Sequence, residues 1–444
     1  NDNDNNDNDN NDNDNKKSSA AIENYSNDRK DSQATICRKQ VNYEIDKSYK
    51  TWLDQNVPIL HYAINIDGIV KIFFITMHLE EQQNFYENHA TWYCIESNAN
   101  NNNDNATTEN VIADVYRAKK GGMVIVKCKY TPHLSMVQSS VSPTSNHTTE
   151  IEPYDIRKLL ECDELEYTAF QNESPGTKYG SCVMIQGEYS RSKIHEWIVY
   201  HHMIGIEHFW VFINEPWSLN KLPILPYVTY IPFDYDIRRH YSHTKYRHGY
   251  IFSQIPMQMQ SIYMMKKYKL HWITTIDIDE YIFVTNEDAI KSPGFELQNL
   301  IENNITNHEE IGGLLMNSIP FGRNVPEEPE DDEHPHPLLI DYIWRDGEDP
   351  WLKPFRHFKF IYNPRNAIDV GVHYLYNGGK EVRFDVKDQV RMHHYKDAQE
   401  GVYLIDRRYH LLKNDTLIVD RYRERVVSAL DKNKKIVYNE GSKN

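Results

Sequence analysis

Residues 268–284 read YKLHWITTIDIDEYIFV, and this stretch sets the expectation for the fold of the whole chain. Its many β-branched and aromatic residues predict one continuous strand. Side chains alternate along a strand, so Asp277 and Asp279 are expected on one face and the neighbouring isoleucines on the other. The two aspartate Cα atoms would lie roughly 6–7 Å apart, at a rise of about 3.3 Å per residue. Two carboxylates inside a buried segment repel each other and need a cation or hydrogen-bond donors.

A divalent metal ion with oxygen ligands, itself bound to phosphates, would meet that need. The plain alternative is a strand that runs out into a polar loop, where acidic residues are ordinary. The apolar residues Tyr281–Val284 continue the buried pattern beyond the acids, which favours the metal site. Glu280 is expected on the opposite face from the two aspartates, where it would orient the strand.

The 444 residues and their hydrophobic fraction of 39% predict about two domains with real cores. The formal net charge is −16, and most of it lies in two stretches, Asn1–Asn15 and Glu327–Glu333. The rest of the chain is nearly balanced, so we expect no face that binds nucleic acid. No apolar run of about 18 residues occurs, so no segment of this sequence is expected to span a membrane. The first residue is not Met, so a membrane anchor is expected only upstream of this sequence.

Five cysteines occur, and none forms the Cys-x-x-Cys motif of a zinc knuckle or a thioredoxin-like site. Cys94 and Cys128 each lie near the end of an expected strand and are the preferred disulfide pair. The loop that they would close, of about 35 residues, is worth about 3–4 kcal/mol in the chain-entropy model. The odd number of cysteines leaves at least one thiol unpaired or paired with a cysteine outside this sequence. Asn-x-Ser/Thr sequons and scattered cysteines favour the lumen of the secretory pathway.

Four segments are expected along the chain. Residues 1–36 begin with an Asn/Asp repeat and are predicted to be a disordered tail. Residues 37–160 hold short β-type runs separated by loops and predict a small all-β domain. Residues 161–178 are interpreted as a linker, and residues 179–444 as an α/β domain with a C-terminal helical extension.

The α/β interpretation depends on alternating strand and helix patterns. Tyr179–Gln186 and Ile206–Ile213 are expected strands, and Ile194–Met203 between them has apolar residues at helical spacing. The short connections predict a parallel pair with a right-handed crossover. Ligands bind at the carboxyl ends of strands in such a sheet, and the two aspartates fall at such an end.

Other side chains are candidates to complete a metal or nucleotide site. His393-His394 lies on a later expected strand and offers an imidazole, although most of the 21 histidines are expected at the surface or in the core. Lys353, Arg356 and the run Arg238-Arg239-His240 are candidates to hold a diphosphate, although most basic side chains are simply solvated. The sequence lacks a P-loop, a Gly-x-Ser-x-Gly elbow and a His-Glu-x-x-His motif.

Short motifs follow one another in a fixed order over about residues 179–400. They are Glu196-Trp197-Ile198-Val199-Tyr200-His201, Gly205, His208-Phe209, Gln254, Asp277-Ile278-Asp279-Glu280-Tyr281, Phe321-Gly322 and His394-Tyr395-Lys396. Together they resemble glycosyltransferase family 92, and Cys94 and Cys128 resemble paired positions before that family's catalytic domain. The chain departs from the family where Ser261 replaces a frequent Cys, where Arg323 replaces a small residue, and where residues 327–337 look like an insertion.

The resemblance implies a GT-A type fold and a metal-dependent, inverting glycosyltransferase. Such an enzyme moves a sugar, typically galactose, from a UDP-sugar donor to a glycan or glycoprotein acceptor with a β-linkage. Mn²⁺ is the implied cofactor, and Asp277, Asp279 and His394 are its implied ligands. The implied location is the Golgi or another secretory lumen, with a type II membrane anchor in the full-length protein.

The resemblance also implies further site residues. Tyr189, Glu196, Asp277 and Lys353 are expected to contact the donor. An inverting displacement needs a carboxylate base, for which Asp346 and Glu348 are candidates. Two other functions stay open: a glycan-binding module with an inactive transferase domain, and a glycoside hydrolase with paired carboxylates about 5–9.5 Å apart.

Overall fold

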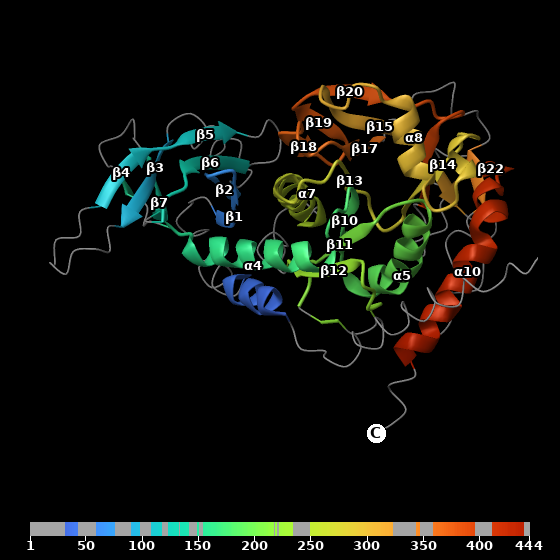
Figure 1. Ribbon diagram of the computed structural model, residues 1–444, viewed down its shortest axis with the longest axis horizontal. Helices are drawn as coiled ribbons and strands as arrows, with labels where there is room; N and C mark the ends of the chain where they lie inside the picture. Colours follow the sequence, from blue (N-terminus) through green and yellow to red (C-terminus); the bar gives the residue numbers. More distant parts are fainter. Residues whose placement is uncertain are drawn as a thin grey trace, which may run out of the picture.

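The computed structural model describes fourteen stretches of the chain, which contain every element named below (Figure 1). They are residues 32–42, 59–75, 90–97, 108–117, 123–132, 134–141, 149–150, 154–216, 218–219, 222–233, 249–322, 343–346, 358–395 and 411–438. Within them the chain is a mixed α/β protein. Among the described helices, none is both long and apolar enough to cross a membrane.

An 11-stranded mixed sheet forms the centre of the second half of the chain. Its main path runs β12-β11-β10-β13-β17-β15-β16-β22, and β14, β20 and β21 join it through β15 and β21. The strands are β10 (Tyr179–Ile185), β11 (His208–Ile213), β12 (Val228–Pro232), β13 (Trp272–Thr274), β14 (Glu280–Val284), β15 (Ile311–Gly322), β16 (Trp344–Asp346), β17 (Phe358–Tyr362), β20 (Lys380–Arg383), β21 (Val390–Tyr395) and β22 (Leu411–Asn414). A separate hairpin consists of β18 (Asp369–Gly371) and β19 (Tyr374–Asn377).

The predicted strand–helix–strand unit is confirmed. Helix α5 (Gly187–Met203) connects β10 and β11, which pair in parallel from Gly180 with His208 to Ile185 with Ile213. Strands β12 and β13 continue the parallel set on either side. Helices α5, α8 (Glu296–Asn304) and α10 (Leu417–Tyr438) contribute to one hydrophobic core, and α7 (Gly249–Lys267) contributes to the other.

The prediction of one continuous strand over residues 268–284 is wrong. Strand β13 ends at Thr274, residues 275–279 form a turn, and β14 begins at Glu280. The chain must turn because β13 pairs with β10 and β17, whereas β14 pairs with β21. Ile276 and Ile278 are buried in the core as expected.

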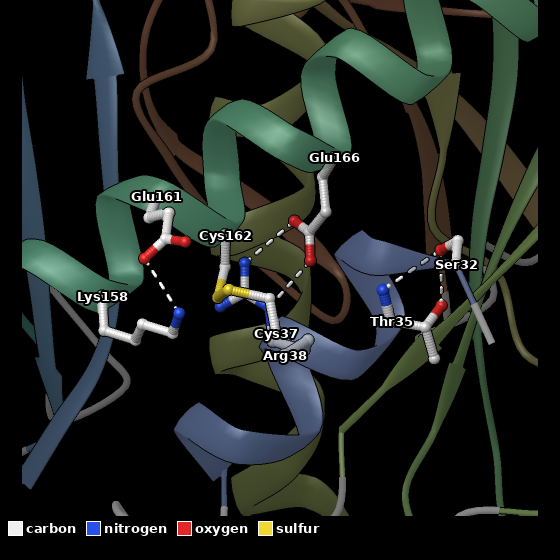
Figure 2. Close-up of a disulfide and its surroundings, with 8 residues drawn as sticks. All are labelled: Ser32, Thr35, Cys37, Arg38, Lys158, Glu161, Cys162 and Glu166. Atoms are coloured by element: carbon white, nitrogen blue, oxygen red, sulfur yellow. Dashed lines mark hydrogen bonds and ion pairs between the residues drawn. A yellow bond between two sulfur atoms is a disulfide. The ribbon is translucent and has the colours of Figure 1, made fainter.

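The expected linker over residues 161–178 is also wrong for most of its length. Helix α4 (Arg157–Glu173) occupies it as far as Glu173, and only a short turn follows. A second helix, over residues 33–42, packs beside α4 and includes the last residues of the expected tail. A disulfide between Cys37 and Cys162 joins the two helices, and Arg38 donates two hydrogen bonds of 2.8 Å to Glu166 (Figure 2).

Two small antiparallel sheets make up the rest of the first half. One has the order β1-β2-β6-β5, and the other has the order β4-β3-β7-β8 with β9 beside β7. The strands are β1 (Ile59–Ile66), β2 (Ile69–Ile75), β3 (Ala90–Ser97), β4 (Thr108–Ile112), β5 (Asp114–Arg117), β6 (Met123–Lys129), β7 (Leu134–Val141), β8 (Thr149–Glu150) and β9 (Tyr154–Asp155). The predicted disulfide between Cys94 and Cys128 is confirmed and joins the two sheets.

These small sheets share a core with the large one. A single hydrophobic cluster contains side chains of β1 and β2 together with side chains of α7, β10 and β11. Phe73 of β2, for example, contacts the ring of Tyr263 in α7, with ring centroids 5.1 Å apart. The structure therefore offers no exposed linker at residues 161–173 between the β-rich part and the sheet.

Cys182 of β10 is the free cysteine of the described residues, and the sequence had left at least one thiol over. It is fully buried, and burial raises the pKa of its thiol to about 12 although a hydrogen bond with Ser261 of α7 opposes the rise. Ser261 is the position where the resembled family often has a cysteine. We therefore expect Ser261→Cys to form a third disulfide, which would join β10 to α7.

Mass spectrometry of the oxidised Ser261→Cys protein should find a peptide crosslinked through Cys182 and no free thiol. Ser253→Cys is a matched control, since Ser253 is also a buried serine of α7. That control should retain two free thiols. A Ser261→Cys protein with two alkylatable thiols under oxidising conditions would contradict the expectation.

Candidate active site

The turn at residues 275–279 lies at the carboxyl end of β13 and is held by side chains from distant parts of the chain. From α5, the indole Nε1 of Trp197 donates to the backbone carbonyls of Asp277 at 3.1 Å and Glu280 at 2.9 Å. Within the turn, the backbone N–H of Asp277 donates to Glu280 Oε2 at 2.8 Å. Glu280 therefore orients the turn from the first position of β14. The expectation that it faces away from both aspartates is wrong, because its carboxylate shares the Lys359 ammonium with Asp277.

Asp277 is bound on both carboxylate oxygens. The amide Nε2 of Gln254 in α7 donates to Oδ1 at 2.7 Å, and the ammonium of Lys359 in β17 donates to Oδ2 at 2.8 Å. The Asp277 side chain keeps 26% of its surface exposed. Each carboxylate oxygen can accept more than one hydrogen bond, so Asp277 can still contact a ligand.

Lys359 is the buried cation of the site. Its side chain is 1% exposed, and its ammonium also lies 3.1 Å from Glu280 Oε2. Burial lowers the pKa of Lys359, but the carboxylates of Asp277 and Glu280 outweigh that effect and raise it above its usual value. The lysine is therefore a permanent positive charge beneath the turn.

Asp279 and His394 form a second pair, beside the Glu280 carboxylate oxygen that does not contact Lys359. Asp279 Oδ2 lies 3.5 Å from His394 Nε2, and His394 Nδ1 lies 3.7 Å from Glu280 Oε1. The pairing of β14 with β21 puts Glu280 opposite His394, and the backbone N–H of Tyr395 donates to the carbonyl of Asp279 at 2.9 Å. Backbone pairing thus fixes the position of the imidazole beside the turn.

His393 points away from this pair, because neighbouring residues on a strand face opposite sides. It is fully buried, its ring stacks on Phe321 with centroids 4.0 Å apart, and its Nε2 accepts a hydrogen bond from Arg391. Burial, followed by the charges of Arg391 and Arg345, lowers its pKa well below the usual value. His393 is a core residue.

Two further predicted residues come from α5. Glu196 is buried, and its charge is the second cause, after burial, that raises the pKa of Tyr281 and of Tyr395. It therefore lies near Tyr281 of β14 and Tyr395 of β21. Tyr189, near the start of α5, is partly buried.

Of the other predicted site residues, the structure describes the backbone position of Asp346. Asp346 ends β16, which pairs with the end of β15 and is separated by that strand from β21. The remaining candidates lie outside the described residues: Glu348, Lys353, Arg356 and the run Arg238-Arg239-His240.

Sequence reasoning missed two site residues, Lys359 and His373. Lys359 had a signal, because it is the one charged residue in the apolar run Phe358–Tyr362. An acid inside an apolar run was the reason for singling out Asp277. His373 precedes β19, and its Nδ1 lies 2.8 Å from the carbonyl oxygen of Phe358. Burial and then Lys359 lower its pKa, while Glu280 and Asp277 oppose the shift.

The metal question can be tested on the contacts within the described stretches. There, no group of three or more His, Cys, Asp or Glu side chains is arranged to hold a metal ion. Asp279 and His394 provide one oxygen and one nitrogen ligand, whereas Asp277 is turned to Lys359 and Gln254. The residues thus fit a site with two protein ligands, whose other positions are left for a substrate or water.

No protein-family model matches the chain, and no curated protein matches it. Among solved structures, a siderophore interacting protein from Acinetobacter baumannii is similar to it at 11% identity, over 57% of this chain and 86% of that chain, with a TM-score of 0.14. A TM-score this low carries no argument about the fold or the function.

Proposed function

We propose that this chain is a metal-dependent, inverting glycosyltransferase with a GT-A type fold. It would move a sugar, with galactose as the first candidate, from a UDP-sugar to a glycan or glycoprotein acceptor with a β-linkage. One observation supports this most strongly. The motifs that resemble family 92 lie far apart in the sequence but meet at one turn. Trp197 and Gln254 contact Asp277, and His394 lies beside Asp279.

The position of that turn also supports the proposal. The strand order β12-β11-β10-β13 is parallel, and the acidic turn follows the carboxyl end of β13. Nucleotide ligands bind at this end of such sheets. The carboxylates would therefore face the diphosphate end of a UDP-sugar.

The proposed division of labour follows from the contacts. Asp279 and His394 would hold Mn²⁺, and the bound ion would supply positive charge to stabilise the leaving diphosphate. Lys359 and Gln254 fix Asp277, whose exposed edge would then accept hydrogen bonds from donor hydroxyl groups. Glu280 holds the turn in place, because it binds the turn backbone and Lys359 at once.

The proposed setting is the lumen of the secretory pathway, such as the Golgi, with the membrane reached through an anchor outside this sequence. The disulfides Cys37–Cys162 and Cys94–Cys128 are compatible with an oxidising compartment. Asp346 and Glu348 stay the candidate bases that would take the proton of the acceptor hydroxyl.

A donor screen tests the proposed function. The purified chain is incubated with Mn²⁺ and UDP-galactose, UDP-glucose, UDP-N-acetylgalactosamine or UDP-N-acetylglucosamine, and UDP release is measured with and without a glycan mixture. We expect UDP release from UDP-galactose that the chelator EDTA abolishes. Release from no donor, together with retained glycan binding, would instead support a glycan-binding module, and hydrolysis of glycans without a nucleotide would support a hydrolase.

The neighbours His393 and His394 provide a test of the metal ligands. His394→Ala should raise the Mn²⁺ concentration needed for half-maximal UDP release by about tenfold or more, because it removes one of two protein ligands. His393→Ala should leave that concentration unchanged and should lower the thermal midpoint, since the ring of His393 packs on Phe321. An unchanged Mn²⁺ requirement in His394→Ala would contradict the assignment of this histidine.

A further inference from the structure

An exposed aromatic side chain lies on the hairpin formed by β18 and β19. Tyr374 follows the hairpin tip, Val372-His373, and is 50% exposed. Its ring stacks on Tyr376, with centroids 5.5 Å apart and planes inclined by 22°. Tyr374 therefore offers solvent a flat aromatic surface that a second ring supports from within the same strand.

The hairpin is fixed to the elements that carry the candidate site. Tyr362 of β17 donates its hydroxyl to the carbonyl of Gly371 at 3.0 Å, at the base of the hairpin tip. From α7, the hydroxyl of Tyr263 donates to the carbonyl of Ile368 at 3.1 Å. Figure 1 accordingly draws β18 and β19 beside β17 and near α7, the two elements that supply Lys359 and Gln254.

The hairpin tip contacts β17, the strand that carries Lys359. His373 Nδ1 lies 2.8 Å from the carbonyl oxygen of Phe358, the residue before Lys359. The same imidazole is within electrostatic reach of Lys359, Glu280 and Asp277. Tyr374, the next residue along the chain, begins β19 directly after this contact.

We propose that Tyr374, supported by Tyr376, is a stacking platform for a pyranose ring of the acceptor saccharide. One face of many pyranoses is an apolar patch of C–H groups, which complements the negative face of an aromatic ring. Ligand sites combine such aromatic surfaces with a few polar groups, and His373 is the polar group beside this one. The assignment to the acceptor rests on the proposed transferase function, whereas the binding of a sugar ring does not.

Direct binding of simple glycosides tests the platform without any transfer reaction. Methyl β-galactoside, methyl β-N-acetylglucosaminide, methyl α-mannoside and methyl α-fucoside are titrated into the full chain, and saturation-transfer NMR reports their dissociation constants. We expect at least one glycoside to bind. Tyr374→Ala should raise its dissociation constant about tenfold, because the substitution removes one aromatic contact. Tyr374→Phe should bind as the unchanged protein does, because it keeps the ring.

Tyr130→Ala is the matched control, since Tyr130 is 44% exposed and directly follows β6, outside the hairpin. It should not alter glycoside binding. Unchanged binding in Tyr374→Ala, or no binding of any glycoside by the unaltered chain, would overturn the platform.

The UDP-release assay separates this proposal from the proposed function. Tyr374→Ala should leave the KM for UDP-galactose unchanged and should raise the KM for a glycan acceptor about tenfold. If glycosides bind through Tyr374 but no donor releases UDP, the platform stands and the transferase proposal is wrong. If UDP is released and glycoside binding does not depend on Tyr374, the transferase proposal stands and the platform is wrong.

Discussion

Asp279→Asn should lower the rate of UDP release at least about a hundredfold, the largest effect that we expect on activity. The substitution keeps the size of the side chain and removes the negative charge that faces His394. The hydrogen bond that ties this position to β21 uses the backbone carbonyl of residue 279, so it survives the change. We therefore expect a folded protein with the thermal midpoint of the unaltered chain and almost no turnover.

Asp431→Asn is the matched control, because Asp431 is an exposed aspartate of α10. It should retain full activity. The measurement is UDP release over a range of Mn²⁺ concentrations, together with thermal unfolding followed by circular dichroism. Turnover of Asp279→Asn close to that of the control at saturating Mn²⁺ would exclude Asp279 as the metal ligand.

Lys359→Met should have the largest effect on stability. Methionine has a similar length but leaves the carboxylates of Asp277 and Glu280 without their shared cation, and the Glu280 side chain is almost wholly buried. The loss of one partner from a buried ion pair costs about 3–5 kcal/mol, because the other charge stays out of water. We expect the free energy of unfolding in urea to fall by about that amount.

A second substitution separates charge from packing. Adding Glu280→Gln to Lys359→Met removes one stranded charge, so the double variant should be more stable than Lys359→Met alone. Lys380→Met is the control on the surface, since Lys380 and Glu310 form an exposed pair, and it should leave stability nearly unchanged. Equal stability of Lys359→Met and Lys380→Met would show that the buried cation does not hold the turn.

The local patterns of the sequence were sufficient to predict the centre of the sheet. The apolar runs of β10 and β11, with the helical spacing of Trp197 and its neighbours between them, gave the parallel pair that the structure contains. The opposite orientations of His393 and His394 also followed from strand alternation alone. These features depend on neighbours in the chain, which is why a single sequence reveals them.

The features that the sequence could not predict depend on distant partners. Residues 275–279 have the composition of a strand, yet Trp197, Lys359 and the pairing of β14 with β21 make them a turn. The prediction of a linker beyond residue 160 missed helix α4, which is joined by a disulfide and an ion pair to Cys37 and Arg38, more than a hundred residues earlier. The candidates for diphosphate binding were basic residues identified by residue type alone. Residue type does not reveal which basic side chain is buried, and the buried one at the turn is Lys359.

The order in which the disulfides can form follows from their nesting. Cys94 and Cys128 lie inside the 125-residue interval between Cys37 and Cys162, and synthesis delivers them before Cys162. Until then Cys37 has only non-native partners, so correct pairing during synthesis requires thiol–disulfide exchange to undo any early bond that it makes. The helix over residues 33–42 is thus made first among the described helices, but the disulfide can fix it only once Cys162, the sixth residue of α4, has been synthesised.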